Sequence, residues 1–339
     1  MDDVWVSLND GRLLHYGQIC NDTDNDTICD EYDNCPETPN PDQNDTDNDT
    51  VGDACDNQTT QVEVNNAIPF IEAKWELSDE DNFTSGTQIY PVPGGNKTVT
   101  TCAIACDNNS IADMAVVSAS VYYPNGTLKG GMPLQLAAND SICRTTVPDW
   151  DIDEFEQKYN QTLCEIYQGN TTMKFHEPPG EYEVHVNVTD KGNLTSELAN
   201  NFTYESLVAI EQDTNLINFG SVVPGSSSQV TGDGDMMTAS NPTIRNIGNV
   251  NVNISVNGTD ISCTTPATCD TEIIPLTNLT TGFNALEFGL PIPGSYGAPT
   301  LPIEPGAMST NLENFELYIP LGTLPGDYQG ELTVAAYEG

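Results

Sequence analysis

Basic residues are scarce in this sequence. Nine lysines and arginines stand against 51 aspartates and glutamates in 339 residues, which gives a formal net charge of -42. Nucleic acids and anionic membrane surfaces are bound through basic patches. The composition therefore excludes nucleic acid as an expected partner and favours cations.

Signals of catalysis and of membrane insertion are also lacking. The three histidines, His15, His176 and His185, are scattered, and there is no H-E-x-x-H, no G-x-S-x-G and no glycine-rich phosphate loop. We therefore expect no enzymatic activity. No stretch reaches about 18 apolar residues, so no direct membrane span is expected in this chain.

The ten cysteines contain no C-x-x-C. This argues against a zinc ribbon or a thioredoxin-like site and for disulfides formed in an oxidising compartment. The spacings predict the local pairs Cys20–Cys29, Cys35–Cys55 and Cys263–Cys269. In an extended strand Cys102 and Cys106 would lie about 13 Å apart, beyond disulfide reach. Either a turn interrupts this stretch, or each of them pairs with Cys143 or Cys164, and we favour the second arrangement.

Two acidic phrases near the start share one internal spacing, "NDTDNDTICDEYDNCP" from Asn21 and "NDTDNDTVGDACD" from Asn44. Each holds a twelve-residue loop with acids at positions 1, 3, 5, 9 and 12, which is the ligand spacing of an EF-hand calcium loop. Ca²⁺ takes about six to eight oxygen ligands, and position 7 supplies a backbone carbonyl. The predicted ligands are Asp22, Asp24, Asp26, Ile28, Asp30, Asp33, Asp45, Asp47, Asp49, Val51, Asp53 and Asp56.

The surroundings of the loops differ from those of an EF-hand. The loops are joined by "CPETPNPDQ", whose three prolines exclude a helix, and Thr27 and Thr50 occupy position 6 in place of glycine. An acidic run alone would indicate a solvated linker, but a linker does not require this register.

The frame from Asp22 to Asp56, with Asn34, Cys35, Pro36, Asn40, Gln43 and Cys55 in place, resembles the thrombospondin type 3 repeat. The resemblance implies calcium-binding segments with almost no apolar core. In such repeats ions and disulfides hold the chain, which acts as a stiff connector.

Asparagine sequons are unusually frequent. By composition about five or six N-x-S/T sites are expected by chance, whereas 18 of the 34 asparagines lie in one. The excess predicts N-linked glycans on an exported surface, although a β protein rich in Thr and Asn would also carry accidental sequons. Leaving aside those generated by the loop phrases, the candidates are Asn57, Asn82, Asn96, Asn108, Asn125, Asn139, Asn160, Asn170, Asn187, Asn193, Asn201, Asn253, Asn257 and Asn278. Met1 is followed by two aspartates and no apolar region, so we expect a mature form or a fragment of a longer product.

Strand patterns dominate from about Ile68 onward. "PGEYEVHVNV" alternates with Tyr182, Val184, Val186 and Val188 on one face, and "NVNVNISV" alternates from Val250 to Val256. Pro-Gly-acid-Tyr occurs at Pro179 and again 146 residues later at Pro325. One short helix is predicted within 149–167. Many short strands and Gly/Pro turns predict two β-sandwiches, which resemble the tandem immunoglobulin-like domains of archaeal and bacterial surface proteins.

The predicted fold class is mostly β, with a calcium-stabilised thrombospondin type 3-like segment and two immunoglobulin-like β-sandwiches. The expected domains are 1–19, 20–60, 65–205 and 206–339, the first a strand or hairpin. Its "VWVSL" must pair with a preceding domain, with "GRLLHYGQI" across Asn9-Asp10-Gly11, or with a sandwich edge of the next subunit.

These features together favour an extracellular or cell-surface structural glycoprotein that binds calcium and associates with itself, as a filament, surface-layer or stalk subunit. The alternative is an adhesin or glycan-binding module on a calcium-stiffened stalk. Trp5, Trp75 and Trp150 could line a sugar site, but packing roles are favoured for all three.

Overall fold

The protein is mostly β, as the sequence predicts. The computed structural model describes residues 4–7, 9–16, 20–56, 62–81, 83–147, 157, 159, 162–283, 287–296, 306 and 309–339. The chain divides into two compact units, Met1–Asn65 and Asn66–Gly339, which we describe separately. Among the described residues no helix is long and apolar enough to cross a membrane.

The first unit opens with a β-hairpin. Strand β1 (Val4–Ser7) pairs antiparallel with β2 (Leu13–Tyr16), with Val4 opposite Tyr16 and Ser7 opposite Leu13. Gly11 in the connecting turn has φ +83°, a conformation that suits glycine. Of the three pairings left open by the sequence, the hairpin is the one observed, so β1 has its partner within this chain.

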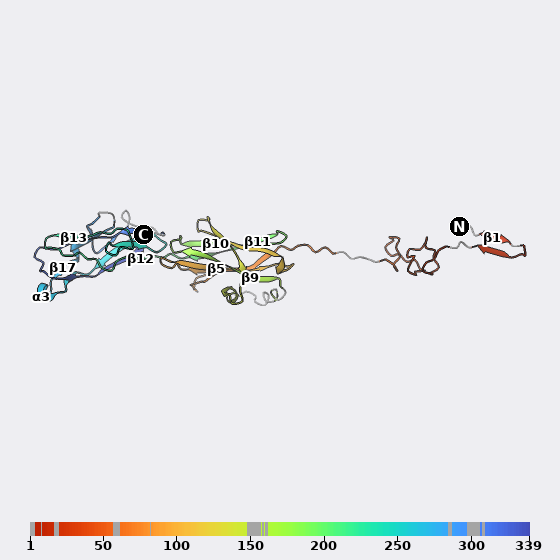
Figure 1. The fold of residues 1–339 in the computed structure, drawn as a ribbon, viewed down its shortest axis with the longest axis horizontal. Helices are drawn as coiled ribbons and strands as arrows, with labels where there is room; N and C mark the ends of the chain where they lie inside the picture. Colours follow the sequence, from red (N-terminus) through yellow and green to blue (C-terminus); the bar gives the residue numbers. More distant parts are fainter. Residues whose placement is uncertain are drawn as a thin grey trace. The chain divides into compact units, whose positions relative to one another are not determined.

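The first half of the second unit is a sandwich of two sheets (Figure 1). One sheet has the order β4 (Thr87–Ile89), β11 (Thr195–Tyr204), β10 (Gly180–Asp190), β6 (Met114–Tyr122), β7 (Leu128–Pro133). The other has the order β3 (Phe70–Leu77), β5 (Asn96–Cys106), β9 (Cys164–Lys174), β8 (Gln135–Leu136).

The predicted alternation of β10 forms the centre of this core. Tyr182, Val184, Val186 and Val188 are all fully buried, together with apolar side chains of β5 such as Ala103 and Ala105. The opposite face of β5 is buried as well, against Trp75 and the segment around the short helix α1 (Ile142–Thr145). A strand covered on both faces explains why "CAIAC" shows no polar alternation.

Two disulfides extend from β5, one to α1 and the other to the neighbouring strand β9 of the same sheet. Cys102 pairs with Cys143 and Cys106 with Cys164, with Cα–Cα distances of 5.6 and 4.0 Å. Both bonds follow from β5, because residues at even spacing in a strand point to the same face. The alternative with a turn within "CAIAC" is therefore not what the chain adopts.

The predicted helix within 149–167 lies mostly outside the described residues. Gln157 and Tyr159, the described residues at its centre, are helical. The window ends in strand β9, whose first residue Cys164 lies opposite Cys106 of β5. The other described helical elements of this half are α1 and the 3₁₀ turn η1 (Ile111–Asp113).

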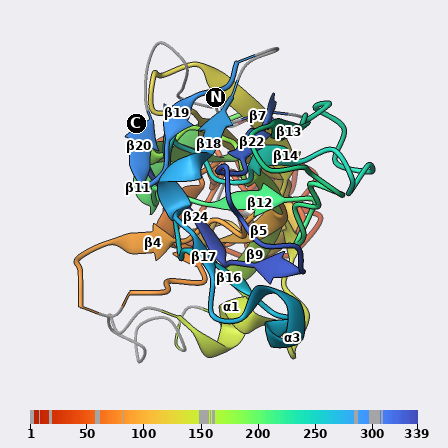
Figure 2. The same ribbon diagram turned by 90° about the vertical axis from the view of Figure 1, so that its left-hand side faces the viewer.

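The second half of this unit contains shorter strands in four small sheets (Figure 2). Their orders are β12 (Ile210–Gln212), β14 (Thr243–Asn246), β21 (Thr310–Leu312); β13 (Ser227–Val230), β22 (Asn314–Tyr318), β18 (Leu279–Gly282), β19 (Leu290–Pro291); β20 (Gly294–Tyr296), β15 (Val252–Gly258), β24 (Leu332–Glu338); and β17 (Ile273–Ile274), β16 (Ile261–Cys263), β23 (Tyr328–Gln329).

One apolar core joins these small sheets. Val252, Ile254 and Val256 of β15 are buried, as their alternation predicts, and pack in one cluster with Phe283 and Phe315. The helix α3 (Pro266–Cys269) lies between the paired Cys263 and Cys269, and η2 (Leu276–Asn278) precedes β18. No described strand of this half joins a sheet of the preceding half.

The repeated Pro-Gly-acid-Tyr motif forms the same corner in both halves. The Tyr182 hydroxyl donates a hydrogen bond to the Pro178 carbonyl, four residues upstream, at 2.8 Å. The Tyr328 hydroxyl lies 3.0 Å from the equivalent carbonyl of Leu324 and 2.9 Å from a carboxylate oxygen of Glu272. Such tyrosine corners are a feature of immunoglobulin-like sandwiches.

Removing the first corner hydroxyl should destabilise the sandwich. Tyr182→Phe keeps the buried ring but leaves the Pro178 carbonyl without its donor, so we expect a loss of about 1 kcal/mol in the free energy of unfolding. Urea denaturation measures this value. Tyr337→Phe, on an exposed side chain, is the control and should change stability little; equal effects of the two changes would contradict a role for the corner.

A buried carboxyl group lies between β21 and β22. The Glu313 side chain is fully buried, accepts a hydrogen bond from the Gln212 amide and has a second oxygen without a partner among the described residues. Burial, helped by the nearby Asp213 carboxylate, raises the pKa of Glu313 to about 7, although the Gln212 hydrogen bond lowers it. The folded protein therefore holds a proton here that the unfolded chain releases at lower pH.

This group should make stability depend on pH. Because the folded pKa is above the ordinary value of 4.5, its contribution is complete below about pH 4.5 and is lost as the pH rises through about 7. Glu313→Gln should abolish that loss, which is on the order of 2 kcal/mol between pH 5 and pH 8. Urea denaturation at both pH values tests this, with the exposed Glu181→Gln as control. An unchanged pH dependence in Glu313→Gln would show that Glu313 is not the group.

Candidate calcium-binding segment

The first predicted loop brings its alternating carboxylates together. Asp22, Asp24 and Asp26 each offer an oxygen within 4.8 Å of the other two. The chain curls round them because backbone N–H groups turn inward: the Thr27 amide donates to Asp22 Oδ2 at 3.0 Å and the Ile28 amide to Asp26 Oδ1 at 2.9 Å. These bonds orient the carboxylates toward the inside of the loop.

The second loop repeats this arrangement. Asp45, Asp47 and Asp49 also gather within 4.8 Å. The Thr50 amide donates to Asp45 Oδ2 at 3.0 Å and the Val51 amide to Asp49 Oδ1 at 2.9 Å. The two loops are therefore equivalent in local structure as well as in sequence.

Oxygens without hydrogen-bond donors point to an ion in the first loop. Asp24 Oδ2 and Asp33 Oδ2 are buried and have no partner among the described residues. Asp33 Oδ1 accepts from the Cys35 amide at 2.7 Å and from Gln43 Nε2 at 2.8 Å. The position-12 carboxylate thus has one oxygen held by the protein and one available to a cation.

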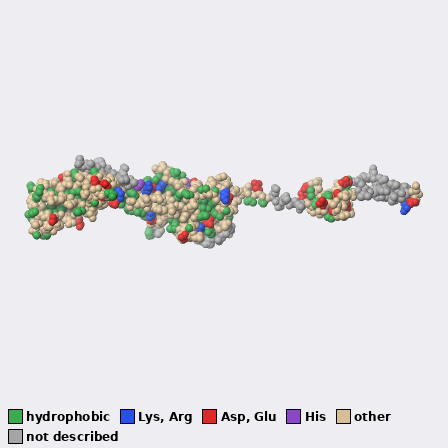
Figure 3. Space-filling view, viewed as in Figure 1, with side chains coloured by type: hydrophobic (Ala, Val, Ile, Leu, Met, Phe, Trp, Pro, Cys, Tyr) green, Lys and Arg blue, Asp and Glu red, His purple; other side chains and the backbone are tan. Residues whose placement is uncertain are grey.

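Charge in the loops is uncompensated by basic side chains. No lysine or arginine occurs between residues 13 and 73, and Figure 3 shows acidic but no basic side chains on the described part of residues 20–56. Desolvation, followed by repulsion from Asp26 and Asp33, raises the pKa of Asp24. Desolvation, with repulsion from Asp49 and Asp56, likewise raises the pKa of Asp47. A bound divalent cation would relieve this repulsion.

The position-9 carboxylates have a bracing role that the spacing did not reveal. Asp30 accepts the Thr23 amide and hydroxyl, both at 2.8 Å, and Asp53 accepts the equivalent groups of Thr46 at 2.8 and 2.7 Å. The Thr23 amide is the main cause that lowers the pKa of Asp30. Each carboxylate therefore ties position 9 to position 2 of its loop.

The predicted position-7 carbonyls belong to Ile28 and Val51. Among the residues that the structure describes, no backbone N–H donates to either carbonyl oxygen. Both remain available as backbone ligands, the role expected from the loop spacing.

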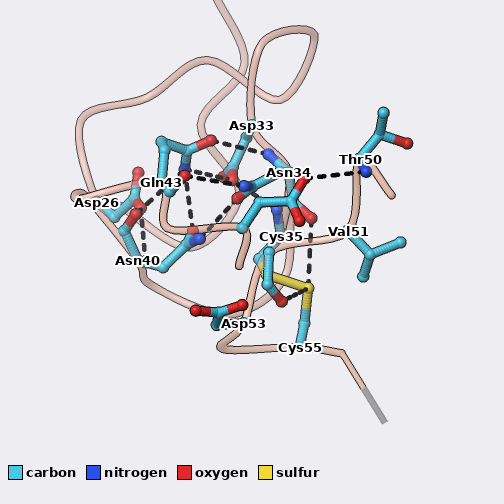
Figure 4. Close-up of a disulfide and its surroundings, with 12 residues drawn as sticks. Asp26, Asp33, Asn34, Cys35, Asn40, Gln43, Thr50, Val51, Asp53 and Cys55 are labelled. Atoms are coloured by element: carbon cyan, nitrogen blue, oxygen red, sulfur yellow. Dashed lines mark hydrogen bonds between the residues drawn. A yellow bond between two sulfur atoms is a disulfide. The ribbon is translucent and has the colours of Figure 1, made fainter. Parts of the chain in front are cut away.

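A polar network takes the place of an apolar core between the loops (Figure 4). Asn34, Asn40 and Gln43 point toward one another, with Asn40 Nδ2 donating to Asn34 Oδ1 at 2.7 Å and Gln43 Nε2 to Asn40 Oδ1 at 3.0 Å. The backbone N–H of Asn40 also donates to Asp26 Oδ2 at 2.7 Å. The network thus connects the proline-rich connector directly to a carboxylate of the first loop.

Glycine is required where the second loop approaches this network. A Cβ atom on Gly52 would lie 2.4 Å from Asn34 Oδ1, and the Gly52 amide donates to the Asn34 carbonyl at 2.9 Å. The disulfide Cys35–Cys55 closes the same region. Cys20–Cys29 joins the chain just before the first loop to position 8 of that loop. Both pairs are those that the spacings predict.

The donor set fits Ca²⁺. Carboxylate and carbonyl oxygens are the ligands that this hard cation prefers, and the orphaned oxygens of Asp24 and Asp33 need a positive partner. Asp22, Asp24, Asp26 and Asp33 would hold an ion in the first loop and Asp45, Asp47, Asp49 and Asp56 one in the second, with the carbonyls of Ile28 and Val51.

Comparison with known families agrees with this reading of the segment. Residues 15–43 and 44–59 match the thrombospondin type 3 repeat. The match includes both loops and their connector, so the resemblance inferred from the sequence is confirmed for this segment. No curated protein matches this chain in sequence at a significant level.

Several solved structures have a distant likeness to this chain. One is the CsuC–CsuE chaperone–tip adhesion subunit complex of archaic Csu pili from Acinetobacter baumannii, at 11% identity and TM-score 0.34, covering 74% of this chain and 96% of that one. Another is the C-terminal domain of the AgI/II polypeptide BspA of Streptococcus agalactiae, at 14% identity and TM-score 0.21, covering 77% and 98%. Similarity at this level carries no assignment of function.

The candidate glycosylation sites lie where a glycan could be attached. None of the described sequon asparagines is fully buried: Asn96, Asn108, Asn125, Asn139, Asn170, Asn193, Asn201 and Asn257 are exposed, and Asn187, Asn253 and Asn278 are half-buried. Asn57, Asn82 and Asn160 lie outside the described residues.

Threonine at position 6 should limit calcium affinity. Thr27 and Thr50 have φ +87° and +78°, a left-handed conformation that costs an L-residue roughly 1–2 kcal/mol. Thr27→Gly keeps the amide that binds Asp22 and removes the strain, so we expect Ca²⁺ binding to the first loop to tighten about threefold to tenfold.

Isothermal titration calorimetry on the full chain measures this gain. Thr38→Gly in the connector is the control, because Thr38 is not among the residues with positive φ. Unchanged or weaker binding in Thr27→Gly would mean that the threonine side chain contributes more to the loop than its conformation costs.

Proposed function

We propose that this chain is an extracellular, calcium-binding structural glycoprotein of the cell surface that acts by self-association and has no enzymatic activity. The observation that carries the proposal is the pair of matched loops whose carboxylates converge without basic partners. Calcium is the chemical component that such loops require in order to stay closed.

The thrombospondin type 3 segment would depend on that calcium for its order. Residues 20–56 are described without a gap, and their buried positions are Asp26, Cys35, Asn40 and Gly52, of which only cysteine is hydrophobic. So small a buried surface contributes little hydrophobic stabilisation. Two disulfides and two ions would then keep the segment stiff, which suits a connector that carries the β-rich unit.

Disulfides and exposed sequons support placement outside the cell. All ten cysteines are paired, which is typical of proteins that fold in an oxidising compartment. Glycans on the exposed asparagines would cover much of the sandwich surface and protect it from proteases.

Self-association is supported by exposed apolar side chains on two adjoining turns. Leu321 and Val223 are 80% and 69% exposed, and their turns are joined because the Gly225 amide donates to the Ile319 carbonyl at 2.7 Å. Exposed apolar groups on adjoining turns are typical of protein contact surfaces. Association through these turns would place copies of the chain in contact at the cell surface.

The calcium sites can be tested one at a time. Asp33→Ala and Asp56→Ala each remove a position-12 ligand, so each should weaken one Ca²⁺ site of the full chain at least about tenfold while leaving the other. Asp42→Ala in the connector removes an exposed carboxylate outside the loop positions and should leave both sites intact. Titration calorimetry gives the affinities. A wild-type chain that binds no calcium would exclude this part of the proposal.

Removal of calcium should expose the segment to protease. With EDTA, cleavage should concentrate within residues 20–56 while fragments of the sandwiches persist, because only the segment lacks an apolar core. Negative-stain microscopy and light scattering of native material test self-association. Monomers that bind a glycan array would instead support an adhesin.

A further inference from the structure

A further group of carboxylates converges inside the first sandwich, in a region without a loop motif. Asp107 follows strand β5, Asp113 ends the 3₁₀ turn η1, and Asp190 ends strand β10. Each offers an oxygen within 4.8 Å of the other two. The cluster thus combines Asp107 and Asp113, from the connection between β5 and β6, with Asp190, which is distant in sequence.

The burial of this cluster calls for a counter-charge. Asp107 and Asp190 are 0% exposed, and Asp107 Oδ2 has no hydrogen-bond partner among the described residues. None of the ion pairs between described residues includes a member of the cluster. The adjacent Lys191 is directed elsewhere, because its ammonium group donates to the Ala112 carbonyl. Ionised carboxylates this deeply buried are costly unless they are paired or bind a metal ion.

Backbone and amide groups hold the carboxylates in place. Asp107 Oδ1 accepts from the Asn109 amide at 2.8 Å, and Asp190 Oδ1 accepts from the Leu194 amide at 2.8 Å. Asp190 Oδ2 accepts from Asn66 Nδ2 at 2.9 Å. These donors fix the side chains and leave Asp107 Oδ2 as the buried oxygen without one.

We propose that Asp107, Asp113 and Asp190 form a Ca²⁺ site in the first β-sandwich, separate from the thrombospondin type 3 loops. The donors are all oxygen, which favours a hard cation over zinc or copper. Ca²⁺ accepts a site of irregular geometry more readily than Mg²⁺, which demands a near-ideal octahedron. Backbone oxygens and water complete its coordination.

The proposed site also contacts the residues at which the chain enters the second unit. Asn66, the first residue of that unit, bonds to Asp190, and the next amide, of Ala67, donates to Asn109 Oδ1 at 2.6 Å. A Cβ atom on Gly192 would lie 2.4 Å from Asn66 Nδ2, so the contact is close. An ion on the three aspartates neutralises Asp190 and Asp107, and it thereby stabilises the elements to which Asn66 and Ala67 are tied.

The test counts calcium ions and locates their effect in the full chain. Equilibrium dialysis with elemental analysis should show one Ca²⁺ fewer per chain in Asp107→Asn than in wild type. In wild type, at a Ca²⁺ concentration about ten times the dissociation constant, hydrogen exchange in residues 107–113 and 190–194 should slow about tenfold. Asp107→Asn should lose this slowing. Asp140→Asn, an exposed aspartate of the same half, is the matched control and should retain both the ion and the slowing.

Two further variants separate this site from the loops and from misfolding. The double variant Asp33→Ala, Asp56→Ala should keep calcium-dependent protection of 107–113, since it alters only the thrombospondin type 3 segment. If Asp107→Asn does not fold, Asp113→Asn at the half-buried position replaces it, with the same expected loss of one ion. Equal Ca²⁺ counts in wild type and variant, with exchange in these residues insensitive to calcium, would overturn the proposal.

Discussion

Carboxylates that are brought together without basic partners are the constraint on which both units depend. Nine basic residues cannot neutralise 51 acidic ones, so most carboxylates must face solvent, accept N–H donors or bind cations. In the loops, the alternating aspartates are held by backbone amides, and in the sandwich Asp107 and Asp190 are held in the same way although they are fully buried. Repulsion in each cluster favours an ion, because no lysine or arginine reaches it among the described residues.

The two units become ordered in physically different ways. The thrombospondin type 3 segment uses a polar network around Asn34, Asn40 and Gln43, two disulfides and charge, since it has almost nothing apolar to bury. The sandwiches use apolar burial, and β5 buries both of its faces. The order of the connector therefore rests on polar contacts and disulfides, whereas that of the β-rich unit rests on apolar burial.

Local patterns were predicted well, because they need only neighbouring residues. The alternation of Tyr182, Val184, Val186 and Val188 predicted their common burial, and the loop spacing predicted the convergence of the aspartates at positions 1, 3 and 5 of each loop. The short helix predicted within 149–167 falls mostly outside the described residues, but Gln157 and Tyr159 within that window are helical. The bracing of Asp30 by Thr23 could have been inferred only from the folded loop, because position 9 has the same residue type as a direct ligand.

The sequence by itself determined the mostly β class, the two calcium loops with their local disulfides, and the recurrence of the Pro-Gly-acid-Tyr corner. Each of these features depends on about a dozen to two dozen neighbouring positions, because backbone geometry determines which residues of so short a segment can come into contact. Only the tertiary structure decided the partners of Cys102 and Cys106, the burial of Glu313, and the meeting of Asp107, Asp113 and Asp190. Those contacts join segments that are far apart along the chain, and no local spacing encodes which of them come to lie together.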